Sequence, residues 1–251
     1  MAVMPVRRLL LNMAWPMMLS MLIQALYNIV DSYFVGQYSN SGLTALSVIF
    51  PVQLIITAIA VGTGVGVNTY MARMYAFGKK RAADCTAGTG MVLAVISWAV
   101  FAAAALLLME PYVRTSATSS GAVADAVLYG NIVCVGSLGI FLESIWTKVH
   151  QAGGNMRLPM LAQIAGALTN IVLDPILIFG LGPVPRMGIA GAAIATVVGQ
   201  CVAAVITGIS GFRRPPKPVV MRKYVRQIYR LGYPSIFMQM LYTVYIMALN
   251  M

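Results

Sequence analysis

Three of the six acidic residues in this chain lie inside long apolar stretches, where a charged side chain is costly. They are Asp31, Glu143 and Asp174. An ionised carboxylate at the centre of a bilayer costs about 2.5 to 3.5 kcal/mol on insertion scales. Such a group must therefore face a cavity, take up a proton or pair with a cation. An ion-coupled transport site alternates between these three states, so these carboxylates are the first candidates for chemistry.

Asp174 has the most suggestive neighbours. Asn170 lies four residues earlier and hence on the same helical face, and Pro175 leaves an upstream carbonyl without its helical donor. A carboxylate, an amide oxygen and a spare carbonyl are hard oxygen donors, which suit sodium or a carboxylate-held proton. Alternatively, Asn170 and Asp174 only tie neighbouring helices together by hydrogen bonds.

The other two carboxylates lie nearer the ends of their apolar stretches. The gap that follows Asp31, residues 37–42, holds no positive charge, so the partner of Asp31 is another helix or a bound cation. The alternative for Asp31 is a shallow, hydrated position near the outer surface. For Glu143 we expect an ordinary interfacial ion pair, with Lys148 or a neighbouring loop, rather than a role in catalysis or transport.

Long apolar stretches define the elements that must position these groups. They cover residues 9–34, 43–70, 85–109, 122–147, 158–181 and 189–212, and a seventh starts near Leu231. At a rise of about 1.5 Å per residue, a 25-residue helix reaches about 37 Å, longer than a hydrocarbon core of about 30 Å. The sequence therefore predicts an all-α, polytopic membrane protein with a six-helix transmembrane bundle and part of a seventh helix.

Positive charge is concentrated in every second gap between these stretches. Fifteen of the seventeen Lys and Arg residues lie there or at the N-terminus, and only Arg114 and Arg186 lie in the opposite gaps. Cationic flanks resist translocation. We therefore expect a multi-pass protein of the cell (inner or plasma) membrane whose N-terminus is cytoplasmic.

Composition narrows the function further. The chain is 60% hydrophobic and 9% charged, and its net charge of +11 is spread over short loops rather than one basic surface, which argues against nucleic-acid binding. Cys85, Cys134 and Cys201 stand singly in or beside apolar stretches, which argues against a disulfide framework and a metal site. We expect no cofactor beyond a coupling ion.

The chain divides into three parts. Residues 1–212 form the six-helix lobe, and residues 213–230 form a basic linker with an amphipathic helix in the headgroup plane or, alternatively, a solvated charged turn. Residues 231–251 begin a seventh transmembrane helix of a second, truncated lobe. Tyr233-Pro234 and Tyr245 repeat the spacing of Trp15-Pro16 and Tyr27, which indicates a duplicated architecture.

Small residues inside the spans predict close helix packing. Gly62, Gly64 and Gly66 follow one another at two-residue spacing, with no strand before them and no Lys-Ser or Lys-Thr after them, so we favour packing over a phosphate loop. The sixth span carries a smooth ridge of small residues, namely Gly188, Ala192, Ala195, Gly199 and Ala203.

Several of these motifs, in this order, resemble the multidrug and toxic compound extrusion (MATE) transporters. They are DSYFVG at 31–36, the Gly62 and Gly66 pattern running to Arg73 and Gly78, QAGGN at 151–155 with Pro159-Met160, NIVLDP at 170–175, and GIAGAAIAT at 188–196. The resemblance covers the whole chain. It implies twelve helices in two six-helix lobes, related by a pseudo-two-fold axis along the membrane normal, that export organic cations in exchange for protons or sodium.

The resemblance also implies site residues. The family's cation site falls on Asp31, Asn170, Asp174 and Thr196, with sodium at the first three as the only metal expected. Tyr27, Met21, Met17 and Phe50 are weaker candidates for a drug cavity, because adaptable thioethers and aromatic faces suit large cations. Two features depart from the family: no second lobe follows Met251, so a missing half or another chain is needed, and His150 stands where an arginine is common.

Two other functions remain open from the residues. An intramembrane aspartyl protease would use Asp31 and Asp174 as a dyad, but neither lies in the Gly-x-Gly-Asp motif of such proteases. A flippase for lipids or lipid-linked sugars shares the two-lobed architecture and predicts cationic residues in the cavity, of which the spans hold almost none. His150, at a helix end without an obvious partner, gives no support for serine or cysteine chemistry. We therefore expect a transporter, not an enzyme.

Overall fold

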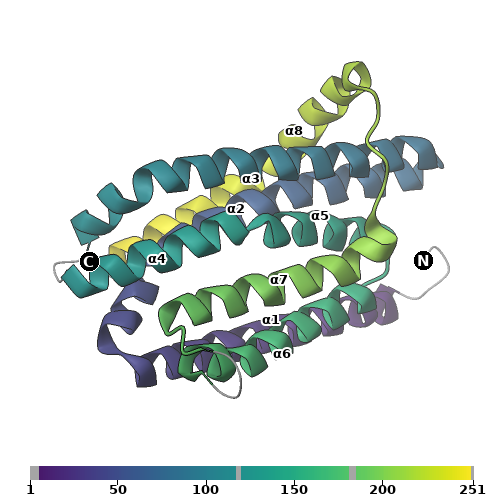
Figure 1. Cartoon of the computed structure of the whole chain (residues 1–251). Helices are drawn as coiled ribbons and strands as arrows, with labels where there is room; N and C mark the ends of the chain where they lie inside the picture. The colour runs from purple at the N-terminus through teal and green to yellow at the C-terminus, as the bar shows by residue number, and fades with distance from the viewer. Residues whose placement is uncertain (1–5, 117–119, 181–184, 250–251) are drawn as a thin grey trace.

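The described part of the chain is helical throughout. The computed structural model describes residues 6–116, 120–180 and 185–249. Its helices lie side by side in a bundle (Figure 1) and are α1 (Val6–Tyr38), α2 (Asn40–Ala76), α3 (Lys80–Ser116), α4 (Ser120–Gly136), α5 (Leu138–Ala152), α6 (Arg157–Phe179), α7 (Ile189–Gly211) and α8 (Pro218–Leu249). The described residues contain no strand, and the all-α prediction is confirmed.

Five of these helices, namely α1, α2, α3, α6 and α7, are long and apolar enough to cross a membrane. The pair α4 and α5 together makes a sixth span, bent by 41°. The predicted seventh span falls on α8, which is not among them, since Tyr233, Pro234 and Gln239 interrupt its apolar part.

The bend between α4 and α5 interrupts the predicted span at 122–147. Ser137 is the break point, and its hydroxyl donates to the Cys134 carbonyl at 2.7 Å, which competes with regular helical bonding. Gly136 and Gly139 flank the break, where a Cβ would meet Val197 or the backbone of Cys201 on α7. The fourth span therefore bends where it approaches α7.

Alternation of the helices brings the basic residues to one end of the bundle. The start of α1, the α2–α3 turn, the α5–α6 turn and the segment before α8 lie at the same end in Figure 1, whereas the α1–α2 connection and the last turn of α8 lie at the other. The gaps that are rich in Lys and Arg all belong to the first group. The gaps rich in Lys and Arg, which alternate along the sequence, therefore lie together at one end of the bundle.

The basic amphipathic segment and the start of the seventh span belong to one helix. After a short extended segment at 213–217, α8 runs continuously through Pro234 to Leu249. Its beginning stands away from the other helices in Figure 1, and its remainder lies along α2. Helical geometry therefore continues from the basic segment into the apolar one.

Glycines allow α2 and α8 to touch. A Cβ on Gly66 would collide with the backbone carbonyl of Ile228, and one on Gly232 would lie 2.7 Å from the carbonyl oxygen of Gly62. Gly64 faces α5 instead, beside Ser144 and Lys148. The packing function predicted for these glycines is confirmed.

A second small-residue contact joins α6 to α7. A Cβ on Gly166 would lie 2.7 Å from the Gly199 carbonyl oxygen, and one on Gly199 would lie equally close to that of Gly166. The predicted ridge on the sixth span therefore packs against α6. This contact holds Asn170 against α7, since Asn170 Cβ lies 3.3 Å from the Cβ position of Gly199.

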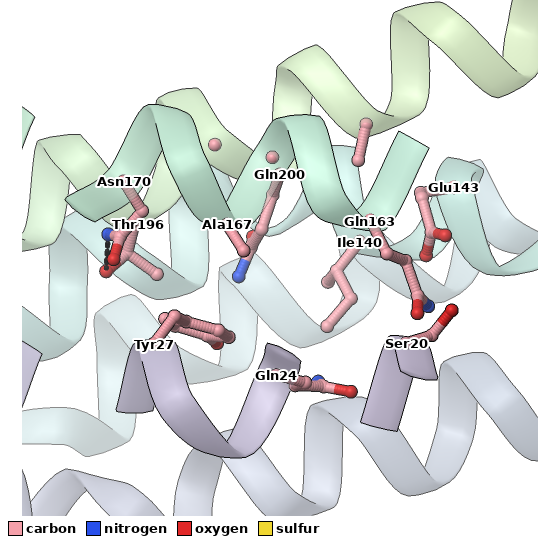
Figure 2. A pocket seen from close by; sticks show the side chains of 13 residues that line it. Ser20, Gln24, Tyr27, Ile140, Glu143, Gln163, Ala167, Asn170, Thr196 and Gln200 are labelled. Atoms are coloured by element: carbon pink, nitrogen blue, oxygen red, sulfur yellow. Dashed lines mark hydrogen bonds between the residues drawn. The ribbon is translucent and has the colours of Figure 1, made fainter. Parts of the chain in front are cut away.

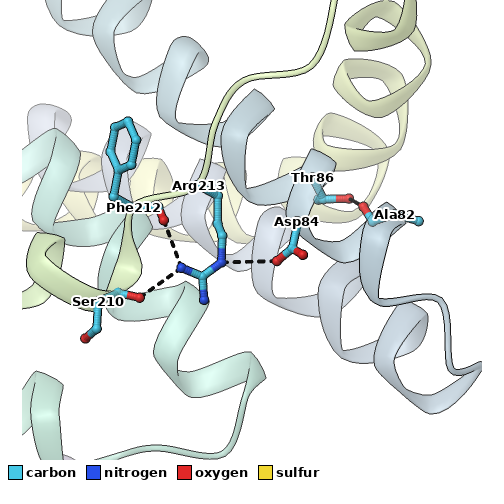
Figure 3. Close-up of polar contacts among 6 residues, drawn as sticks. All are labelled: Ala82, Asp84, Thr86, Ser210, Phe212 and Arg213. Atoms are coloured by element: carbon cyan, nitrogen blue, oxygen red, sulfur yellow. Dashed lines mark hydrogen bonds and ion pairs between the residues drawn. The ribbon is translucent and has the colours of Figure 1, made fainter.

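The segment that leads to α8 is tied to α3 by one ion pair (Figure 3). Arg213 Nε lies 3.1 Å from Asp84 Oδ1, and Arg213 Nη1 donates to the carbonyls of Ser210 and Phe212 at 3.0 and 2.8 Å. Both charged side chains are about half exposed. The pair fixes where the chain leaves α7.

We expect Gly66→Ala to destabilise the protein by about 1 to 3 kcal/mol, because the new methyl group must displace the backbone of α8. Thermal unfolding in detergent, followed by circular dichroism, measures the change. Gly121→Ala on α4 is the matched control, since nothing lies within 4 Å of its Cβ position. Equal melting temperatures for the two variants would contradict the packing argument.

We expect the Asp84–Arg213 pair to contribute at most about 1 kcal/mol, because exposed ion pairs are screened by water and salt. A double-mutant cycle of Asp84→Asn and Arg213→Gln, measured by the same unfolding experiment, gives the coupling energy. A coupling of several kcal/mol would show that the pair is far less solvated than its exposure indicates.

Candidate functional site

Four side chains predicted as the cation site come from three helices. Asp31 lies on α1, Asn170 and Asp174 lie one turn apart on α6, and Thr196 lies on α7. Asn170 Nδ2 lies 3.4 Å from Asp174 Oδ1 and 3.4 Å from Thr196 Oγ1. With its amide turned over, Asn170 donates to Asp174 Oδ2 at 3.1 Å and accepts from the Thr196 backbone N–H at 3.2 Å. In either orientation Asn170 links Asp174 to α7.

The two aspartates are buried beside each other. Asp174 is fully buried and Asp31 is 7% exposed, and the two lie close enough to interact electrostatically. Among the described residues, Asp31 Oδ1 has no hydrogen-bond partner. In the same ranges the ion pairs shorter than 4 Å are Arg114–Glu110 and Arg213–Asp84, and neither involves these aspartates. The burial of Asp31 argues against the hydrated surface position that its sequence left open.

Two residues that sequence reasoning did not single out complete the cluster. Tyr129 on α4 is buried, accepts a hydrogen bond from Gln53 Nε2 on α2 at 3.2 Å and bonds to Thr196. Its phenol also lies within electrostatic reach of Asp31. Gln53, an amide inside an apolar run, was the signal available in the sequence. Tyr27 on α1 lies within electrostatic reach of both aspartates, so five helices contribute to one polar cluster.

An elongated cavity of about 100 Å³ begins at this cluster (Figure 2). Tyr27, Asn170 and Thr196 line one end, and Ser20, Glu143 and Gln163 line the other. The full lining is Ser20, Gln24, Tyr27, Ile140, Glu143, Gln163, Gly166, Ala167, Asn170, Thr196, Gly199, Gln200 and Ala203. None of these thirteen described residues is Lys or Arg. The cavity lining combines a mostly apolar surface with several amide and hydroxyl groups, and the one carboxylate among these thirteen residues is Glu143.

The weaker cavity candidates are distributed differently from one another. Tyr27 lines the cavity, whereas Met21 and Met17 line an adjoining hollow of about 60 Å³. Phe50 on α2 is 42% exposed and lines neither space. The structure thus brings Tyr27 to the cation cluster, places the methionines near the opposite end of the cavity, and leaves Phe50 apart from both spaces.

Glu143 corrects the expectation of an ion pair. No ion pair within 4 Å joins it to Lys148, although the two are close enough to interact electrostatically. Glu143 instead accepts a hydrogen bond from Thr147 Oγ1 at 2.7 Å, and Lys148 Nζ donates to Gln151 at 2.9 Å. Residues five apart on a helix point about 140° away from each other, which keeps the ammonium off this face.

His150 also differs from expectation, because it has a partner. Its Nε2 lies 3.0 Å from the Thr207 carbonyl oxygen on α7, and the side chain is buried. The Thr207 hydroxyl donates back within α7, to Ala203 and Ala204, at 2.9 and 3.1 Å. We therefore assign His150 to the packing of α5 against α7.

Comparison with known proteins identifies the class. The MatE family model matches residues 16–176, which is more than half of the chain. The chain therefore belongs to the MATE family of membrane transporters, as its motifs predicted. It is 33% identical over 207 residues to a FAD transporter of Shewanella oneidensis, covering 81% of this chain and 45% of the relative.

Other relatives and solved structures agree. A probable multidrug resistance protein NorM of Thermotoga maritima is 26% identical over 237 residues, covering 92% of this chain and 51% of that protein. A MOP superfamily transporter of Pyrococcus furiosus and an outward-facing multidrug resistance MATE transporter each superimpose with a TM-score of 0.87 at 28% identity, covering 96% of this chain and 54% and 55% of theirs. The chain thus spans about half the length of the relatives it matches, and it has the fold of one lobe.

We expect Thr196→Val to cost about 1 kcal/mol more stability than Thr207→Val, because only Thr196 bonds to side chains of other helices. Both threonines are buried on α7, which makes them a matched pair. Thermal unfolding in detergent measures the difference. Equal losses would mean that the Asn170–Thr196 contact contributes nothing to the folded state.

Proposed function

We propose that this chain forms one lobe of a secondary antiporter that exports small organic cations in exchange for protons or sodium. The observation that carries the proposal is the pair Asp31 and Asp174, two buried carboxylates that interact electrostatically and have no ion-pair partner among the described residues. Mutual repulsion and burial both make a mobile positive guest favourable there. Asn170 and Thr196, which belong to the same cluster as Asp174, line one end of the cavity, and we propose that such a guest arrives from there.

The proposed coupling site consists of Asp31, Asn170, Asp174 and Thr196. Their carboxylate, amide and hydroxyl oxygens are ligands that suit sodium, and the carboxylates alone can hold a proton. Tyr129 and Gln53 position the site from behind, since their hydrogen bonds connect α2 and α4 to Thr196. No cofactor beyond the coupling ion enters the proposal.

The proposed mechanism is alternating access. A proton or sodium ion bound between Asp31 and Asp174 removes their demand for a cationic partner, so the emptied cavity can close. Pro16 and Pro175 lie inside α1 and α6 and are the points where these helices can bend. A coupling ion shifts this equilibrium only to the extent that it binds one state better than the other. Substrate and coupling ion thus compete for one pool of negative charge.

Cationic rather than anionic substrates are favoured by the cavity lining. It contains a carboxylate and several amides and no Lys or Arg among its thirteen described residues. Several relatives carry names that describe multidrug resistance or export, while one is a FAD transporter. An anion as large as a flavin dinucleotide would find no complementary charge among the thirteen residues that line this cavity.

The remaining parts of the proposal concern the orientation of the chain in the membrane and the second lobe. The end of the bundle that gathers the basic residues is proposed to face the cytoplasm, with the N-terminus on that side of the cell membrane. A second lobe, from the same or another chain, is proposed to close the pathway, because relatives are about twice as long. The protein is a transporter in this proposal and has no catalytic residues.

The competing functions have less support. A flippase should present cationic residues to the cavity, and the lining has none. A protease dyad needs two carboxylates open to a water molecule and a peptide, whereas Asp174 is fully buried and its carboxylate is bonded to Asn170. Family membership also points to transport.

We expect Asp174→Asn to reduce proton- or sodium-driven efflux of a fluorescent organic cation to background, because the variant cannot bind the coupling ion as a charge. Efflux is measured in cells or proteoliposomes that contain this chain together with a second lobe. Glu110→Gln, which removes an exposed carboxylate paired with Arg114, is the control and should transport normally. Undiminished efflux by Asp174→Asn, at equal expression, would remove the site from the mechanism.

A further inference from the structure

The end of the cavity away from the aspartates has its own chemistry. Figure 2 shows Glu143 of α5, Gln163 of α6 and Ser20 of α1 gathered there, at the opposite end from Asn170 and Thr196. The proposed coupling site uses none of these three residues. A carboxylate that faces a cavity inside a membrane-spanning bundle is costly unless a ligand or water serves it.

The hydrogen bonds around Glu143 leave acceptors available. Thr147 Oγ1 donates to Glu143 Oε1 at 2.7 Å, and the Gln163 side chain lies close to the carboxylate. A carboxylate offers about four lone-pair positions, so the bond from Thr147 leaves room for further donors. Ser20 donates to its own helix, to the Pro16 carbonyl at 2.9 Å, and so presents its own lone pairs to a ligand.

Lys148 does not fill this position. Its ammonium donates to Gln151 at 2.9 Å and lies on another face of α5, where it moderates the charge of Glu143 from a distance. The ligand that fits is therefore a cation with N–H donors. A quaternary ammonium has the charge but no hydrogen to donate.

The adjoining hollow supplies an apolar surface at the right place. Four methionines, Met17, Met21, Met156 and Met160, line a space of about 60 Å³, and Ser20 and Gln163 line both this hollow and the main cavity. A ligand whose nitrogen contacts Glu143 can therefore lay an alkyl group against the thioethers. Methionine side chains adapt to alkyl groups of different shape.

We propose that Glu143 and Gln163 form a second ligand site, which binds the ammonium group of a primary or secondary alkylamine while its chain lies on Met17, Met21, Met156 and Met160. This site is separate from the Asp31–Asp174 pair. That the bound amine is also exported rests on the function proposed above, but its binding does not.

Direct binding to the purified chain tests the site without any ion gradient. The probes are hexylamine and hexyltrimethylammonium, titrated calorimetrically into the chain in lipid nanodiscs. The control is E110Q, which removes an exposed carboxylate and reports the partition of each probe into lipid. We expect the unmodified chain to bind hexylamine more tightly than its quaternary counterpart, and E143Q to weaken hexylamine binding about tenfold, the size expected for a charge-assisted hydrogen bond.

A second variant tests the apolar half and keeps the proposal falsifiable if E143Q does not fold. M160A should weaken hexylamine binding and leave methylamine binding unchanged, since only the longer amine reaches the hollow. The proposal is overturned if E143Q binds hexylamine as tightly as E110Q does, or if hexylamine and hexyltrimethylammonium bind equally well to the unmodified chain. It is also overturned if M160A binds hexylamine as tightly as the unmodified chain does.

The result separates this site from the transport proposal. Loss of amine binding in E143Q together with normal efflux by Asp174→Asn would retain the amine site and remove the coupling site. Normal amine binding in E143Q together with lost efflux by Asp174→Asn would do the reverse.

Discussion

The cost of a carboxylate away from water is the constraint on which this bundle depends. Three of the six predicted spans, at 43–70, 85–109 and 189–212, avoid it by carrying no charge. The ion pairs found among the described residues join partly exposed groups near helix ends. Asp31, Glu143 and Asp174 accept the cost. Asn170 bonds to Asp174 and Thr147 donates to Glu143, whereas Asp31 Oδ1 has no hydrogen-bond partner among the described residues. Fixed cations would neutralise the carboxylates permanently, whereas hydroxyls and amides stabilise them without satisfying their charge. A neutral polar surrounding is what a reversible cation site requires.

Close helix contacts make that surrounding possible. Gly166 and Gly199 let α6 and α7 approach backbone to backbone, so the short Asn170 side chain can reach both Asp174 and Thr196. Bulkier residues would move α7 outward and break the connection. On the other side of the lobe, Gly62, Gly66 and Gly232 bring α8 against α2 in a similar way. In membranes, helices associate through close packing rather than through the hydrophobic effect, so small residues at the contact are important.

The sequence predicted those features of the arrangement that depend on residues close together along the chain. The length of the apolar stretches predicts the helices, and the charge in alternate gaps predicts which helix ends lie on the same side. The four-residue spacing of Asn170 and Asp174 puts these two residues on one helical face. The contributions of Gln53 and Tyr129 depend on how α2 and α4 pack, which no local pattern records. The break at Ser137 was missed because hydropathy is indifferent to one serine between glycines. The ion pair expected for Glu143, with Lys148 or a neighbouring loop, does not form within 4 Å among the described residues, because helix geometry separates Glu143 from Lys148.

The lining of the cavity, rather than the fold, decides what this lobe can hold. Relatives with the same architecture include a FAD transporter and multidrug exporters, and one solved structure of the superfamily is described as having a binding pocket of reverse polarity. A common bundle is therefore associated with different named functions, as expected when function lies in sites placed on a common scaffold. Here the two ends of one cavity differ. Tyr27, Asn170 and Thr196, which belong to the cluster around Asp31 and Asp174, line one end, and Glu143, near the methionine-lined hollow, lines the other. The first suits a small ion and the second suits an amine with an apolar chain, so competition between ion and substrate needs only their common charge and not a common position.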